Sequence, residues 1–142
     1  MSRFIAQSKM QYDGLYEESI KNPEKFWSDF AENEFTWQKK WDKVLDFDLR
    51  KPSIKWFEGA KLNITENCID RHLDTIGDQT AIIFEPNNPN EDSQHISYRD
   101  LAVNVNKTAN MLKALGAKKG DRICLYMPMV PELAIAMLAC AR

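Results

Sequence analysis

The sequence predicts an α/β fold in layers, with helices on both faces of a sheet, preceded by an added and mostly helical or irregular N-terminal extension. From residue 80 onward the expected order is strand, strand, helix, strand, helix. The last of these helices, residues 133–141, is apolar on every side, as expected for a helix buried within a layered fold. Alternating strands and helices of this kind are typical of α/β proteins.

Composition bounds the possible functions. The chain of 142 residues is long enough for a domain with a real core, and it is 44% hydrophobic and 28% charged with a net charge of −2. This balance disfavours a nucleic-acid surface, and no signal-peptide pattern or transmembrane stretch is present. Three widely spaced cysteines form no CxxC pair, so we expect reduced, buried thiols in a cytoplasmic protein: Cys68, Cys124 and Cys140.

The N-terminal third predicts two helices and then an irregular segment. Apolar residues at helical spacing indicate a helix over residues 8–21, and Asn22-Pro23 is typical of the start of a second. Residues 35–57 hold six large aromatic side chains among many charges, without a period of 2 or 3.6. We interpret them as a segment that wraps along a core, anchored by its aromatic rings. Stacking of nucleic-acid bases is the less favoured alternative, because the lysines are offset by carboxylates.

The remaining elements follow from caps and turns. Asn63 or Thr65 can cap a helix that runs to about Ile76, and residues 80–85 and 95–98 predict a hairpin around a polar, proline-broken loop. Ser97 and Asp100 resemble a capping box that starts an amphipathic helix, with Leu101, Val105, Ala109, Leu112 and Leu115 on one face. Residues 123–127 predict a buried strand before the apolar helix. Because that helix ends the chain without a C-cap, we expect a piece of a longer protein.

The chain offers little local chemistry. Its five glycines form neither GxGxxG nor GxxxxGK[ST], so no phosphate-cradling loop is predicted. Cys68 and His72 have the i, i+4 spacing of two metal ligands or of a nucleophile and its base, but His95, Cys124 or Cys140 would have to complete a metal site. We favour core packing for this pair, and an ion pair or a surface charge pattern for Asp70-Arg71. Core packing is also favoured over a ligand groove for Met127, Met129 and Met137.

Two long stretches resemble a known family. They are WFEGAKLNITENCIDRHL (residues 56–73) and YMPMVPELAIAMLACAR (residues 126–142), supported by FWSDFAENEFTW and KKWDKVLDFD. The chain is similar to the N-terminal part of the acetyl-coenzyme A synthetases, in the adenylate-forming superfamily. Ala60 departs from the family, which commonly has a second glycine in that turn. The resemblance implies an N-terminal extension over residues 1–66 and the truncated start of the large adenylating domain over residues 67–142.

The resemblance also implies an activity for the longer enzyme. Members make acetyl-CoA from acetate, ATP and CoA through acetyl-adenylate, with Mg²⁺, and then rotate a C-terminal domain. Their phosphate loop and catalytic lysine match no position here, so no catalytic, cofactor-binding or metal residue is assigned, and we expect the chain alone to bind no cofactor and to be inactive. Propionyl- or acetoacetyl-CoA synthetases and a non-catalytic interaction module remain alternatives. We expect no nucleic-acid or membrane partner, and self-association through the exposed C-terminal helix.

Overall fold

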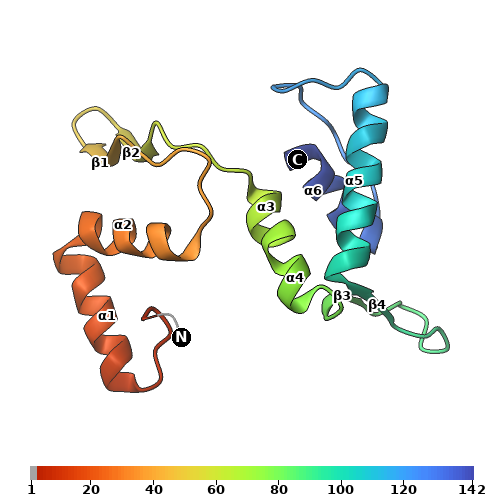
Figure 1. The fold of residues 1–142 in the computed structure, drawn as a ribbon, viewed down its shortest axis with the longest axis horizontal. Coiled ribbons are helices and arrows are strands. Elements are labelled where there is room, and N and C mark those ends of the chain that lie inside the picture. Colours follow the sequence, from red (N-terminus) through yellow and green to blue (C-terminus); the bar gives the residue numbers. More distant parts are fainter. Residues whose placement is uncertain (1–2) are drawn as a thin grey trace. The chain divides into compact units, whose positions relative to one another are not determined.

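The computed structural model describes residues 3–142, which divide into two compact units, one up to Leu62 and the other from Asn63 to Arg142 (Figure 1). The predicted domain boundary at residue 66 lies a few residues beyond this division and stays a prediction. Each unit is described by itself below.

The first unit begins with two helices, as the sequence predicts. Helix α1 (Lys9–Lys21) starts at Ser8, whose side chain accepts a hydrogen bond from the Gln11 amide. Helix α2 (Pro23–Glu34) follows directly, with Pro23 in its first turn. The Asn22 side chain makes no capping hydrogen bond, so the fixed φ of Pro23 is the feature that favours this start. Phe26 of α2 is buried and meets the ring of Phe4 edge-on at 5.5 Å.

The segment expected to be irregular contains a β-hairpin instead. Strand β1 (Lys43–Asp48) pairs antiparallel with β2 (Ser53–Glu58), from Lys43 opposite Glu58 to Asp48 opposite Ser53. The prediction missed the hairpin because the connecting residues, LRKP, lack the glycine or asparagine that marks a tight turn. The expected aromatic anchoring holds for Trp37, Trp41 and Phe57, whose rings lie 4.9 to 5.7 Å apart.

The second unit starts with a broken helix. In place of one continuous helix up to Ile76 there are three short pieces, α3 (Ile64–Cys68), η1 (Asp70–His72) and α4 (Leu73–Ile76). The break falls at Ile69, whose φ of −125° and ψ of −67° leave the helical region. The Ile69 side chain is fully buried at this point. The chain therefore bends where its most apolar contact with the core is made.

The hairpin and the long helix agree with the prediction. Strand β3 (Thr80–Phe84) pairs antiparallel with β4 (Gln94–Ser97), with a register shift between Thr80 and Ile82. Helix α5 (Tyr98–Ala114) follows at once. The Ser97 hydroxyl accepts from the Asp100 amide at 3.0 Å and donates to the Asp100 carboxylate at 2.6 Å, which confirms the expected cap.

The core of this unit lies where α5, α6 (Pro131–Ala141) and Ile69 meet. Most of the buried side chains recur at intervals of four residues along each helix, and several are alanines that let the helices approach closely. The buried set is Ile69, Leu101, Ala102, Val105, Ala109, Ile135 and Ala139. Leu115, expected on the buried face of α5, is instead exposed beyond its last turn.

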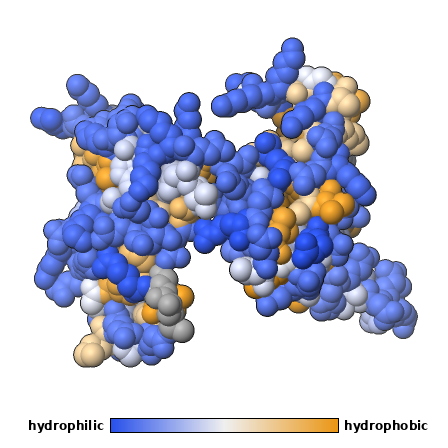
Figure 2. Space-filling view, in the orientation of Figure 1, coloured by the Kyte–Doolittle hydropathy of each residue, from blue (hydrophilic) through white to orange (hydrophobic). Residues whose placement is uncertain are grey.

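Two expectations for the C-terminal stretch were wrong. Residues 121–128 form no strand, because within the described chain the sheets are two separate hairpins and neither gives this segment a partner. Helix α6 is not buried all round: one face packs on α5, whereas Met137 on the other is 60% exposed. The surface accordingly shows apolar patches over the part of the molecule that holds α5 and α6 (Figure 2).

Candidate functional site

A polar cluster of the second unit joins its first turn to the end of α6. The Asn63 carboxamide oxygen accepts from both the amide and the hydroxyl of Thr65, at 2.9 and 2.7 Å. The Asn67 side chain donates to the Asn63 carbonyl at 3.1 Å. Thr65 and Asn67 are buried, so these bonds satisfy groups that solvent does not reach.

Arg142 connects this turn to α6. Its guanidinium donates to Asp70 Oδ1 at 3.0 Å and to the Thr65 hydroxyl at 3.3 Å, and its carbonyl accepts from the Asn63 amide group at 3.4 Å. The sequence predicted a cap at Asn63 or Thr65, and an ion pair or a surface charge pattern for Asp70-Arg71. The carboxylate lies beside Arg142 instead, a contact across 72 residues that no local pattern indicates.

The chemistry of this cluster is that of structural support. Among residues 3–142 no buried side-chain nitrogen or oxygen lacks a hydrogen-bond partner. A site that binds a ligand usually keeps polar groups directed toward it. Because the hydrogen bonds described above run between residues of the cluster itself, the cluster can hold backbone segments together.

Cys68 and His72 were expected to pack in the core rather than to bind a metal ion or to act as a nucleophile and its base. The structure contradicts the expected burial of the thiols, since Cys68, Cys124 and Cys140 are all exposed. The break at Ile69 explains the first case, because it turns Ile69 inward and leaves Cys68 outside. The His72 ring faces Tyr98 at 5.5 Å. Across the described residues, no three His, Cys, Asp or Glu side chains gather in a way that could hold a metal ion.

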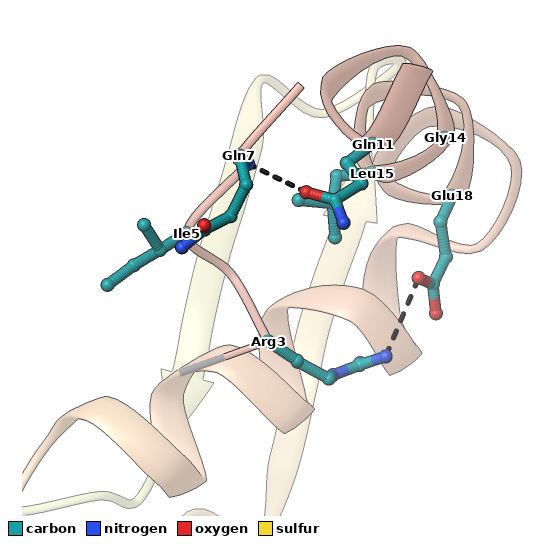
Figure 3. Close-up of a pocket in the computed structure, with 7 residues that line it drawn as sticks. All are labelled: Arg3, Ile5, Gln7, Gln11, Gly14, Leu15 and Glu18. Carbon is teal, nitrogen blue, oxygen red and sulfur yellow. Dashed lines mark hydrogen bonds and ion pairs between the residues drawn. The ribbon is translucent and has the colours of Figure 1, made fainter. Parts of the chain in front are cut away.

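An open cleft of about 660 Å³ lies in the first unit, between the N-terminal segment and α1 (Figure 3). Its charged groups face one another: Arg3 lies 3.7 Å from Glu18 and 2.8 Å from Asp29. The amide of Gln7 donates to the Gln11 side chain at 2.7 Å across the cleft. The lining therefore carries no uncompensated cation that would attract a phosphate or a carboxylate.

Shifted pKa values occur at exposed ion pairs. The hydrogen bond from Lys25 holds the pKa of Asp29 below its ordinary value, helped by the charge of Arg3. The bond between Lys43 and Asp46 raises the lysine pKa and lowers the aspartate pKa. The side chains of Asp29, Asp46 and Lys43 are 34%, 44% and 55% exposed and lie outside any enclosed site, so the shifts report surface pairing rather than a catalytic acid or base.

The residues present do not fit a nucleotide phosphate. The glycines with positive φ, Gly59, Gly116 and Gly120, lie in separate turns. Helix α6 begins with Pro131, which has no amide hydrogen, and Glu132, whose charge opposes an anion at that end. No step of phosphate chemistry can be derived from these side chains.

Two known protein families match this chain. Residues 12–68 match the family described as acetyl-coenzyme A synthetase N-terminus, and residues 69–142, just over half of the chain, match the AMP-binding enzyme family. The chain belongs to the AMP-binding enzymes. The two matches meet between the end of α3 at Cys68 and the start of η1 at Asp70, next to residues of the polar cluster.

Individual proteins that resemble this chain are CoA synthetases. The chain is 61% identical over 132 residues to the acetyl-coenzyme A synthetase of Magnetococcus marinus, covering 93% of this chain and 20% of that protein. It is 53% identical over 131 residues to acetyl-coenzyme A synthetase 2 of Pseudomonas aeruginosa, covering 92% and 20%. The solved acetoacetyl-CoA synthetase from Streptomyces lividans matches with a TM-score of 0.80 and 28% identity, covering 96% of this chain and 20% of that one.

These matches confirm the predicted family and α/β fold class. The chain spans about a fifth of the length of the curated relatives it matches. In the part of the chain that the structure describes, no helix is both long enough and apolar enough to cross a membrane.

Proposed function

We propose that this chain is the N-terminal portion of an acetate–CoA ligase, which makes acetyl-CoA from acetate, ATP and CoA through acetyl-adenylate, with Mg²⁺. The observation that carries the proposal is the identity of 61% to an acetyl-coenzyme A synthetase over nearly the whole chain. Acetate is favoured over acetoacetate because the match to the acetoacetyl-CoA synthetase has only 28% identity.

In this proposal the chain contributes scaffold rather than reacting groups. Its closed polar cluster, its compensated cleft and its scattered glycines support a role in building the enzyme, with the phosphate- and acyl-binding groups supplied by residues beyond Arg142. A cytoplasmic location is proposed with it. The isolated chain is therefore expected to be inactive.

Sequencing the source gene beyond the codon for Arg142 tests the proposal. The expected result is an open frame that continues into a Ser/Thr/Gly-rich loop ending in Pro-Lys, as the family resemblance implies. A stop codon at that point would refute it and favour the alternative, a non-catalytic interaction module.

A further inference from the structure

The polar contacts of Arg142 bring together the two ends of the second unit. Asn63 is the first residue of that unit, and Arg142 directly follows α6. The contacts that Arg142 makes with Asn63, Thr65 and Asp70 are called the clasp below. They link positions 72 to 79 residues apart, so they cannot arise from local helix geometry.

The environment of the clasp separates it from an ordinary surface ion pair. The side chains of Arg142 and Asp70 are 22% and 33% exposed, and the guanidinium also bonds to Thr65, which is 1% exposed. The pair formed by Arg99 and Asp78 in the same unit has the same length, 3.0 Å, yet its side chains are 57% and 88% exposed. Charge-assisted bonds strengthen as water is excluded, so only the first pair should hold its elements firmly.

We propose that the clasp is a positioning device, which fixes the first turn of the second unit to the end of α6. Ile69 follows this turn and places its side chain in the core, so a fixed turn also fixes the bend at Ile69. The guanidinium suits the place, because a cation is favoured at the carboxyl end of a helix. In the longer enzyme the clasp also directs the chain that leaves α6; this last part alone rests on the proposed function.

Hydrogen exchange of the Ile69 amide, which donates to the Thr65 carbonyl at 2.8 Å, is the measurement that tests the clasp. Asp70→Asn should speed this exchange about tenfold relative to the amides of β3 and β4, because a bond to a charged group is lost from a half-buried site. Asp78→Asn is the matched control and should leave the rate within about twofold. Arg142→Lys should also speed exchange, since an ammonium cannot reproduce the two directed bonds of a guanidinium.

The clasp is supported if the Ile69 amide exchanges at least three times faster in Asp70→Asn than in Asp78→Asn. A smaller difference between the two exchange rates overturns it. Each single variant multiplies the exchange rate of the Ile69 amide by some factor. In the double variant Asp70→Asn with Arg142→Lys, the combined factor should be at least about three times smaller than the product of the two single factors, because both changes remove the same interaction. Fully multiplicative effects would show that the residues act independently. The experiment needs only this chain, so its outcome is independent of whether acetate is the substrate.

Discussion

Truncation of Ile69 is the sharpest test of the core described above. Ile69 is 0% exposed and belongs to the buried cluster formed with α5 and α6. Ile69→Ala removes three carbons, which costs about 2.5 kcal/mol at about 0.8 kcal/mol for each buried methylene. The remaining cavity raises the expected loss of unfolding free energy to about 3–5 kcal/mol. For a unit of this size, that loss lowers the melting temperature by at least about 10 °C.

Ile83→Ala is the matched control, because Ile83 lies in β3 of the same unit and is 61% exposed. The same three carbons are removed from a side chain that solvent already reaches, so the expected loss is under about 1 kcal/mol. Urea unfolding followed by far-UV circular dichroism measures both variants, since α5 and α6 carry much of the helical signal. Equal losses in the two variants would refute the placement of Ile69 in the core.

Three further predictions concern the backbone, a charge and the surface. Gly59→Ala should lower the free energy of unfolding by about 1–2 kcal/mol in urea, because Gly59 has φ +80° and an added Cβ would lie 2.1 Å from Asp42 Oδ2. Gly14→Ala in α1 should raise that free energy by about 0.5–1 kcal/mol, because the space around Gly14 is open. The opposite order of the two effects would contradict the geometry. NMR of the carboxyl carbons should give Asp29 a pKa below the ordinary value of 3.8. Its stabilising contribution is therefore full above the unfolded pKa and is lost as the pH falls through the lower folded pKa. A normal titration would show that its pair with Lys25 is absent in solution. Light scattering should show self-association that Met137→Lys reduces, because α6 exposes apolar surface; a monomer at all concentrations would contradict this expectation.

The elements that the sequence predicted well are those whose signals lie within their own residues. Ser97 and Asp100 cap α5 without help from distant residues, and the polar loop between β3 and β4 limits the chain to a hairpin. Helix α5 also shows the predicted apolar stripe from Leu101 to Leu112, which depends only on its own residues. Such features can be inferred before any tertiary contact is known.

The elements that were missed depend on distant partners or lack a local signal. A strand exists only when another strand pairs with it, so residues 123–127 form no strand although their pattern is apolar. The bend at Ile69, the exposure of Cys68 and the contact between Asp70 and Arg142 all follow from packing between segments far apart in sequence. The hairpin of β1 and β2 was missed because its turn has no characteristic residue.

Grafting the chain onto a relative tests the central claim most directly. In the acetyl-coenzyme A synthetase of Magnetococcus marinus, this chain would replace the fifth of that protein that it matches at 61% identity. Pyrophosphate release is then measured with ATP and acetate, for the graft and for the isolated chain. We expect acetate-dependent release from the graft and none from the chain alone. Pyrophosphate release by the isolated chain would contradict the account. A graft that folds but releases pyrophosphate far more slowly than the unmodified relative would also contradict it.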